Sequence, residues 1–417
     1  MTMRRQILST LVAMTIAAAP SVTEAGAEPA ERRGGGDRQI HLERWDTAKQ
    51  WRGGHLGGVE VDGGKVAFAE PDDQATYGGQ DYDLARWTSP WVAPGFSYTQ
   101  LIASWSAKTP GDSFIEIKAR GRTAGGDITS WDILGRWAAG DKHHQRRTIS
   151  GQADDGTSVN VDTWEADGGL PSYQLRITLL RRKGTTARPS VDLATVMTSR
   201  LPRAAGATSE PGAAAGTVLD VPRYSQMIHK GHYDKWGGGG EAWCSPTSTS
   251  MVLAYYDKLP SPKRYAWVPD DHTDPWVDHA ARMTYDYAYG GTGNWPFNTA
   301  YAAPLAGKAF VTRLRSLREA EKFIAVGIPL IVSISFEAGQ LDGAPIGSSD
   351  GHLLVIAGFQ EDGDVVVNDP AADTSKGVRR VYERGQFEKI WLEAAGGLTY
   401  VIHDAAHPLP PGKHSNW

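Results

Sequence analysis

Polar and apolar residues alternate through most of residues 38–200. Residues 58–62 and 65–70 flank Gly63-Gly64, which is the pattern of a β-hairpin. In residues 173–179 every second residue is apolar, as expected for a strand with one face in a core. Similar alternating runs occupy residues 96–106, 114–120, 131–137 and 159–164. About eight such strands without a helical period predict an all-β sandwich, jelly-roll-like in type, over residues 38–200.

The pattern changes after residue 200. Residues 201–218 consist mostly of Ala, Gly, Pro, Ser and Thr, a composition that favours an exposed linker. Beyond them, the apolar run 328–336 is typical of a strand buried on both faces. The other predicted elements are helices at 246–256 and 317–326, and strands at 219–226, 353–359 and 364–368. Residues 219–404 are therefore predicted to form an α+β domain.

The first residues have the pattern of an export signal. Arg4-Arg5 precedes a short apolar run at 7–20, and Ala25-Gly26-Ala27 offers small residues for cleavage. The run is too short to span a bilayer stably, and no later segment is long and apolar enough to do so. We therefore expect a signal peptide over residues 1–27 and a secreted or periplasmic mature protein; the choice between Sec and twin-arginine export stays open.

Charge and cysteine content narrow the function. The chain has 43 basic and 48 acidic residues, a net charge of −5 and no basic stripe, which argues against nucleic acid as the main partner. Its one cysteine, Cys244, excludes an intramolecular disulfide. In an oxidising compartment a lone cysteine is either a small buried hydrophobe or a nucleophile. Cys244 follows a glycine-rich loop and precedes the predicted helix start, where the helix dipole favours thiolate, so we expect a nucleophile.

A thiol hydrolase also needs a base, a group that orients the base and donors for the oxyanion, and His352, Asp369 and Gln226 are the candidates. A two-residue turn at Asp362-Gly363 would place His352 opposite position 373, four residues beyond Asp369 on the same face. An ideal ladder would separate the two by about 13 Å. Contact therefore requires a bulge, a bend or strong twist.

Several motifs together resemble a known family. They are Val-Pro-x-Tyr-Ser-Gln at 221–226, Trp-Cys-Ser-Pro at 243–246, Gly-Ile-Pro-Leu-Ile-Val-Ser-Ile at 327–334, Asp-Gly-His-Leu-Leu-Val at 350–355 and Val-Asn-Asp-Pro at 367–370. This order resembles the bacteriocin-processing cysteine peptidases, and especially their secreted "-like" branch, which has a papain-like fold. The resemblance covers residues 219–404 and none of the β-rich half.

The resemblance implies roles for the candidate residues. Cys244 would be the nucleophile, His352 the general base and acid, and Asp369 the orienting carboxylate. The Gln226 side chain and the Cys244 backbone N–H would bind the oxyanion. Members that trim bacteriocin leaders are usually fused to membrane transporters, and the absence of a transmembrane or nucleotide-binding motif argues against that function here. Cys-Ser-Pro replaces the family's frequent Cys-Gly, a minor departure.

Other clusters have weaker chemical meaning. In the β-rich half, tryptophans suggest a glycan-binding platform, although core packing is the favoured interpretation of each one: Trp45, Trp51, Trp87, Trp91, Trp105, Trp131, Trp137 and Trp164. Asp154-Asp155-Gly156 suits calcium or a polar turn.

Two polar groups in the second half could suggest a metal: His229 and His232 with Asp234, and His272 with Asp274 and His279. Neither has a standard hydrolase spacing, so polar loops are favoured and no metal or cofactor is expected. The aromatic, glycine-rich residues 285–301 are interpreted either as a loop that walls the cleft or as core packing.

Three classes of function remain. The favoured class is a secreted cysteine peptidase or amidase that cleaves peptide, protein or peptidoglycan-like substrates through a thioester acyl-enzyme. A transglutaminase-like acyltransferase would use the same residues. The third class is a non-catalytic glycan-binding protein with a degenerate papain-like domain.

Overall fold

The computed structural model describes residues 37–417, so the predicted signal peptide at 1–27 lies outside the described residues. All described residues belong to one compact unit, in which antiparallel sheets predominate and several helices are present. Among the helices of this part of the chain, none is long and apolar enough to cross a membrane. We refer to residues 37–200 as the N-terminal half and to residues 219–417 as the C-terminal half.

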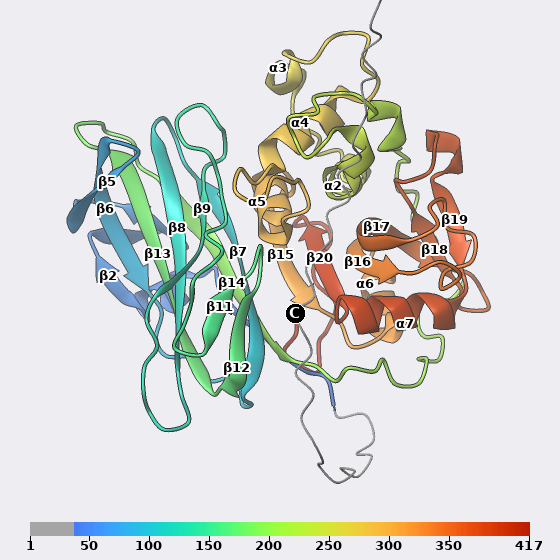
Figure 1. The fold of residues 1–417 in the computed structure, drawn as a ribbon, viewed down its shortest axis with the longest axis horizontal. Coiled ribbons are helices and arrows are strands. Elements are labelled where there is room, and N and C mark those ends of the chain that lie inside the picture. The colour runs from blue at the N-terminus through green and yellow to red at the C-terminus, as the bar shows by residue number, and fades with distance from the viewer. Residues whose placement is uncertain (1–36) are drawn as a thin grey trace, which may run out of the picture. The chain divides into compact units, whose positions relative to one another are not determined.

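The N-terminal half contains two antiparallel sheets (Figure 1). The first has the order β10 (Ala153–Asp154), β11 (Thr157–Val159), β12 (Trp164–Leu170), β7 (Tyr98–Lys108), β14 (Ser190–Arg200), β4 (Lys65–Phe68) and β3 (Val59–Asp62), with β1 (Gln39–Trp45) paired to β14. The second has the order β2 (His55–Gly57), β6 (Gln80–Thr88), β13 (Ser172–Arg182), β8 (Ser113–Arg122) and β9 (Asp132–Trp137), with β5 (Asp73–Tyr77) paired to β6. A short helix, α1 (Ala48–Arg52), follows β1. The hairpin predicted around Gly63-Gly64 is confirmed as β3–β4.

Tryptophans fill the core of this half. Trp87 packs edge-on against Trp51 and Trp45, with ring centroids 4.8 and 5.4 Å apart. Its Nε1–H donates to the Trp51 carbonyl at 2.9 Å, which satisfies the polar end of a buried ring. Six of the eight tryptophans named above have at most 3% of their surface exposed, so the core interpretation is correct for them. Trp91 and Trp131 are partly exposed.

The C-terminal half contains the third sheet. Its order is β15 (Lys308–Arg313), β20 (Leu398–His403), β16 (Leu330–Phe336), β17 (Ser349–Phe359), β18 (Val365–Asn368) and β19 (Arg379–Tyr382). The helices are α2 (Cys244–Tyr255), α3 (Pro262–Tyr265), α4 (Pro275–Thr284), α5 (Trp295–Ala306), α6 (Leu317–Ile324) and α7 (Arg384–Ala394). Three short 3-10 helices complete the set: η1 (Met227–His229), η2 (Gly240–Ala242) and η3 (Ser375–Gly377).

Helices cover both faces of this sheet (Figure 1). Along β16, Leu330 and Val332 belong to the core shared with α6 and α7, whereas Ile331 belongs to the core shared with α2 and α5. All three side chains are fully buried, which confirms the strand predicted to be buried on both faces.

Three local predictions were wrong. Residues 219–226 form no strand; Val218 makes one isolated bridge to Gly358, and Pro222 has no N–H with which to extend a ladder. Residues 159–164 contain a turn between β11 and β12, closed by a hydrogen bond from Asn160 N–H to the Thr163 carbonyl. The loop interpretation of 285–301 fails from Trp295, where helix α5 begins because the Asn294 side chain caps the N–H of Phe297; the alternative, core packing, is correct for Phe297 and Tyr301.

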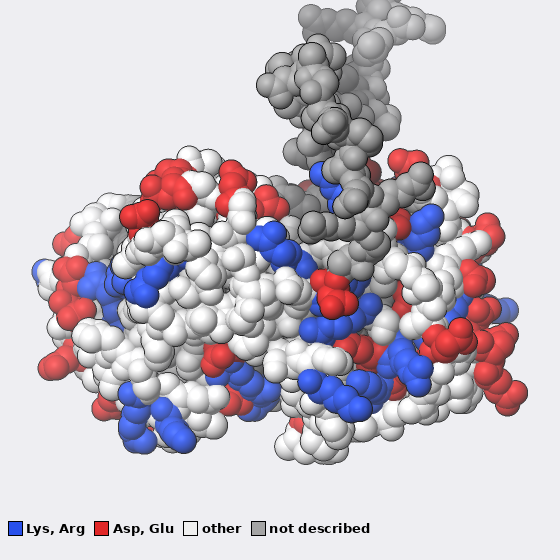
Figure 2. Space-filling view, turned by 90° about the horizontal axis from the view of Figure 1, so that it is seen from below, with Lys and Arg blue, Asp and Glu red and all other residues white. Residues whose placement is uncertain are grey.

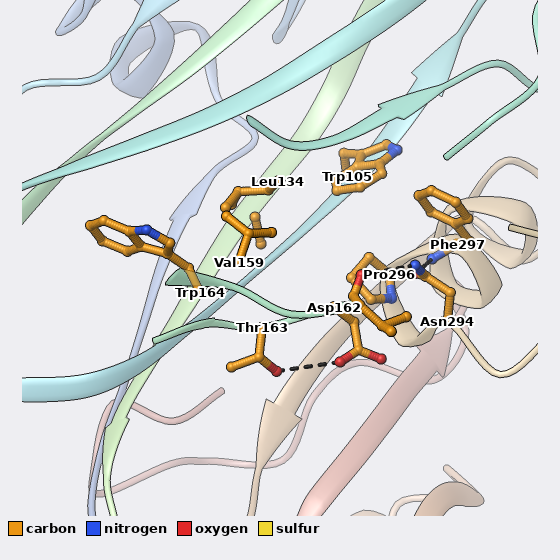
Figure 3. Close-up of a pocket in the computed structure, with 11 residues that line it drawn as sticks. Trp105, Leu134, Val159, Asp162, Thr163, Trp164, Asn294, Pro296 and Phe297 are labelled. Atoms are coloured by element: carbon orange, nitrogen blue, oxygen red, sulfur yellow. Dashed lines mark hydrogen bonds between the residues drawn. The ribbon is translucent and has the colours of Figure 1, made fainter. Parts of the chain in front are cut away.

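The two halves share a packed junction. Phe297 of α5 lies against Trp105 and Trp137, with ring centroids 6.1 and 5.3 Å apart. Figure 3 shows Phe297, Pro296 and Asn294 beside residues of the N-terminal half, among them Asp162 and Thr163. The junction is therefore a continuation of the hydrophobic core.

Polar contacts also cross this junction. Thr148 Oγ1 donates to Asp286 Oδ2 at 2.5 Å, and Asn294 Nδ2 donates to Thr148 Oγ1 at 3.0 Å. Residues 201–218 connect the halves without a helix or strand. They bind to the C-terminal half, where Ser209 N–H and the Ser209 hydroxyl donate to the Glu388 carboxylate at 2.6 and 2.7 Å.

Candidate active site

Cys244 is the first residue of α2 and is partly exposed. The helix therefore begins two residues before its predicted start. Trp243, at the N-cap, provides no side-chain hydrogen bond, so the first backbone N–H groups have no side-chain cap. Because Cys244 is the first residue of α2, the positive end of the helix dipole lies near it.

The glycine loop before Cys244 needs its glycines. Gly237, Gly238 and Gly239 have φ values of +74°, +90° and +95°, which residues with a side chain rarely adopt. At Gly240 a Cβ atom would lie 2.3 Å from the backbone carbonyl of His229. The sequence of four glycines thus lets the chain pass close to the 226–229 segment shortly before Cys244.

His352 and Asp369 are in direct contact. His352 Nε2 lies 2.7 Å from Asp369 Oδ1, and both side chains are almost completely buried. The Tyr382 hydroxyl donates to the other carboxylate oxygen at 2.7 Å, and the N–H of Ala371 donates to Oδ1 at 3.0 Å. The sequence interpretation missed Tyr382, because no local pattern indicates that β19 pairs with β18 beside Asp369.

The turn between β17 and β18 is longer than predicted, and this reduces the offset between His352 and Asp369. Gln360 N–H donates to the Asp364 carbonyl at 2.9 Å, so the loop contains three residues rather than the predicted two. That extra loop residue shifts the register by one position, and Phe359 pairs with Val365.

A β-bulge further reduces the offset between His352 and Asp369 along the hairpin. The register shifts again between Ile356 and Gly358, which leaves Ala357 as the additional residue of the bulge. Val355 then pairs with Asn368, and continued pairing would place His352 opposite position 371. The offset from Asp369 is therefore two residues instead of the expected four. Of the three devices that the sequence spacing allowed, a bulge, a bend or strong twist, the hairpin contains a bulge.

Cys244 and His352 form an electrostatically coupled pair. Burial favours the neutral thiol, but a hydrogen bond from His352 and its charge lower the pKa of Cys244 overall, with help from the Leu353 and Ser245 backbone. Burial also opposes the imidazolium form of His352. The charge of Asp369, the hydrogen bond that Asp369 accepts from His352, and Cys244 outweigh burial and raise the pKa of His352 to about 10. Burial likewise acts against ionised Asp369, but His352 and Tyr382 lower the pKa of that carboxyl. The ionised arrangement of thiolate, imidazolium and carboxylate is thus favoured.

A second contact holds the helix of Cys244 against the strand of His352. Ser248, one turn into α2, donates its hydroxyl to the Leu353 carbonyl at 3.1 Å. This bond fixes α2 relative to β17 beside both candidate residues. It is the second contact that sequence reasoning missed.

Gln226 lies beside the loop that precedes Cys244. Its Nε2 donates to the Glu241 carbonyl at 2.6 Å, three residues before Cys244, and its backbone N–H donates to the Pro370 carbonyl at 2.8 Å. The carboxamide has two N–H bonds, so one is left for an oxyanion. Gln226 therefore links the Cys244 loop to the segment that follows Asp369.

The other polar candidates have different surroundings. Asp155 adopts φ +49° in a turn and accepts from the Ser130 N–H at 2.8 Å, which fits the polar-turn interpretation. Of the two histidine groups, His229 and His232 lie together with Asp278, a residue that the sequence interpretation did not name. Asp234, Asp274 and His279 are not part of this cluster.

A cysteine at a helix start, coupled to a histidine that contacts a buried carboxylate, matches the residue set of the cysteine hydrolases. Residues 218–398 match the model of the Peptidase_C39 like family, and residues 41–199 match that of the Peptidase C39 N-terminal domain. The chain belongs to the C39-like cysteine peptidase family. The predicted resemblance is confirmed, and it extends into the β-rich half, where none was expected.

Other comparisons add little. The search of curated proteins finds no match. A crystal structure of LamAcat from Zobellia galactanivorans is 10% identical over 39% of this chain and 92% of that one, with a TM-score of 0.19. A score this low supports no inference about fold or activity.

Proposed function

We propose that the chain is a secreted cysteine peptidase or amidase whose C-terminal half has a papain-like arrangement. The supporting observation is the position of His352, which bonds to Asp369 through Nε2 and is coupled to Cys244. Because Nε2 is occupied, Nδ1 is the nitrogen left for the sulfur.

The proposed reaction has two steps. The Cys244 thiolate attacks the carbonyl carbon of the scissile bond, and the Cys244 N–H and the free N–H of Gln226 stabilise the oxyanion. His352 donates its Nδ1 proton to the departing amine, the C–N bond breaks and a thioester forms. His352 then accepts a proton from water, whose oxygen attacks the thioester and releases the acid and the thiolate.

Asp369 and Tyr382 act on the imidazole rather than on the substrate. Asp369 fixes the ring orientation and favours the imidazolium, and Tyr382 holds Asp369. Both are therefore positioning residues in the proposed mechanism.

Alkylation of Cys244 tests the proposal. Because the sequence contains a single cysteine, an iodoacetamide adduct that intact-mass spectrometry detects in the native protein but not in Cys244→Ala reports this residue. At mildly acidic pH we expect alkylation much faster than that of free cysteine, and a large loss of rate in His352→Ala but not in the exposed-surface control His55→Ala. A native thiol no more reactive than free cysteine would contradict the proposal.

Hydrolysis and acyl transfer are separated by the acceptor. With a peptide or peptidoglycan-like substrate, we expect a carboxylate product that Cys244→Ala does not form. Accumulation of an amide when a primary amine is added would favour the transglutaminase-like alternative.

The partly exposed tryptophans of the N-terminal half support a second proposal, binding of an anionic glycan. Trp91 stacks with Arg122 and Trp131 stacks with Arg176, each with 4.1 Å between guanidinium carbon and ring centroid. Arg120 lies between the two rings, 5.5 Å from Trp91 and 4.5 Å from Trp131. We call these five residues the Arg–Trp ladder.

Charge favours an anionic partner for the ladder. Arg120 and Arg176 donate to the neutral acceptors Gln174 and Thr88. Burial and the neighbouring Arg122 lower the pKa of Arg120, as expected where guanidinium charges accumulate. On the uncovered part of the face seen in Figure 2, basic and acidic side chains are interspersed.

Binding to an acidic polysaccharide tests the ladder. We expect weaker binding by Trp131→Ala and Arg120→Gln, with no change in the control Arg52→Gln, an exposed arginine of α1. Equal binding by all the variants would rule out the ladder as the site.

A further inference from the structure

Two segments that are separate in the sequence converge on one buried carboxylate. Asp278, in the first turn of α4, has no exposed side-chain surface. Its Oδ2 lies 3.0 Å from His229 Nδ1, and its Oδ1 lies 3.0 Å from His232 Nδ1 and 3.3 Å from His272 Nδ1. Three imidazoles thus present the same ring nitrogen to one carboxylate.

The burial of the cluster is graded. The His229 side chain is fully buried, whereas those of His232 and His272 are 20% and 19% exposed. The His232 and His272 rings stack with centroids 3.5 Å apart. Because these two side chains are partly exposed, an ion can reach the cluster from their side.

The spacing of the donor atoms suits a small divalent ion. The candidate ligand atoms of His229, His232 and Asp278 all lie within 4.8 Å of one another. Two ligands at about 2.1 Å from a tetrahedral zinc ion are about 3.4 Å apart, close to the observed nitrogen–oxygen distances. Imidazole nitrogen with carboxylate oxygen is a donor set that zinc accepts, whereas calcium and magnesium prefer oxygen alone.

We propose that His229, His232 and Asp278 bind a zinc ion through Nδ1, Nδ1 and the carboxylate, and that His272 completes the coordination. His272 lies outside the tightest group but already contacts Asp278 through Nδ1, and its ring would turn out of the stack with His232 to bind the ion. With four protein ligands the site is closed and structural in type.

The position gives the ion a role in the fold. His229 ends η1, which begins directly after Gln226, and its ring lies 6.0 Å from that of Trp243. A zinc ion would fasten the 226–232 segment to α4, a helix that contributes none of the candidate catalytic side chains. It would thereby stabilise the loop on which Gln226 and Cys244 depend.

Metal analysis of the full chain tests the site. The Cys244→Ala background is used, because zinc also binds a cysteine–histidine pair and would otherwise report the wrong site. We expect one zinc ion per chain by mass spectrometry, visible d–d absorption on substitution with cobalt, and a fall of several degrees in Tm when a chelator removes the ion.

The control variants separate zinc binding from hydrogen bonding alone. Asp278→Asn and His232→Ala should lose the zinc and the response of Tm to chelator, whereas His414→Ala, an exposed histidine elsewhere, should keep both. If Asp278→Asn does not fold, His232→Ala and chelation of the background protein still decide the question. Protein expressed with zinc that contains none, or whose Tm ignores the chelator, would overturn the proposal and leave three hydrogen-bonded histidines.

Discussion

At the residue scale, the candidate site depends on keeping one buried carboxylate ionised. Asp369 is 1% exposed, and an unpaired charge at such a position would cost several kcal/mol. Three donors, from His352, Tyr382 and Ala371, share its two oxygens. The charge that results is what raises the pKa of His352 and, through it, lowers that of Cys244.

Replacing Tyr382 with phenylalanine tests this arrangement. Tyr382→Phe leaves a buried carboxylate oxygen without its donor, so we expect the free energy of unfolding to fall by about 1–3 kcal/mol. We also expect kcat to fall about tenfold with little change in KM, because the imidazole is less well oriented. Urea denaturation and steady-state kinetics measure the two effects.

Tyr301 provides the matched control for Tyr382. It is also a buried tyrosine of the C-terminal half, but its hydroxyl has no hydrogen-bond partner among the described residues. Tyr301→Phe should therefore be close to neutral in both measurements. Similar losses in the two variants would contradict the role given to Tyr382.

The pH dependence of kcat/KM is a second residue-scale prediction. Activity should rise as Cys244 ionises, at a pH below the thiol's ordinary value of 9.0, and fall as His352 loses its proton near pH 10. In Asp369→Asn the carboxylate charge is absent, so the pKa of His352 should fall and the alkaline limb should move to lower pH. An alkaline limb that does not move would show that Asp369 leaves the imidazole unaffected.

At the element scale, the β17–β18 hairpin decides whether the site exists. A three-residue loop and a bulge at Ala357 each shift the register by one position. Next to the bulge, the incoming segment 217–219 docks on the strand: Leu219 N–H donates to the Ala357 carbonyl at 2.8 Å. The bulge therefore serves both the site and the attachment of the preceding segment.

Alanine substitution at Gly358 tests this docking. A Cβ atom there would lie 2.3 Å from the Thr217 carbonyl oxygen and 2.6 Å from the Val218 Cα, so the backbone must move. We expect Gly358→Ala to lower the free energy of unfolding by about 1–3 kcal/mol, as overpacking does. Gly351, on the same strand, has no neighbouring atom within 4 Å of its added Cβ, and Gly351→Ala should change the free energy by about 0.5 kcal/mol or less. Urea denaturation compares the two; equal stability would contradict the close approach.

At the scale of the whole molecule, the two halves depend on each other. Residues 37–417 form one compact unit, and hydrogen bonds from Thr148 to Asp286 and from Asn294 to Thr148 cross the junction. The N-terminal half is therefore part of the structural support of the C-terminal half.

Substitution of Phe297 tests how much the junction between the two halves contributes to the free energy of unfolding. Phe297→Ala removes a ring packed between Trp105 and Trp137, so we expect a loss of about 3–5 kcal/mol in the free energy of unfolding. Ile128→Ala, at a side chain 49% exposed, should have almost no effect. Tryptophan fluorescence during urea denaturation follows both, and a stable Phe297→Ala variant would show that the halves are independent.

Several strands and the position of Cys244 at a helix start could be predicted from local sequence. Alternation at 58–70 and 173–179 predicted strands because one face of each is in a core. The position of Cys244 at a helix start followed from the glycines and proline that flank it. The loop interpretation failed at 285–301, where aromatic residues and glycines obscured helix α5, although core packing was correct for Phe297. The strand prediction failed at 219–226, where tertiary contact replaces a ladder.

The sequence by itself determined the lone cysteine, its place at a helix start, and the histidine and aspartate that could serve it, since these depend only on residue type and neighbouring positions. The tertiary structure decided whether they meet. The turn length and the bulge at Ala357 set the distance between His352 and Asp369, and strand pairing supplied Tyr382. The tertiary structure also brought His229, His232 and His272 together around Asp278. Contacts between residues far apart in the chain depend on register and packing, and spacing along the sequence does not encode either.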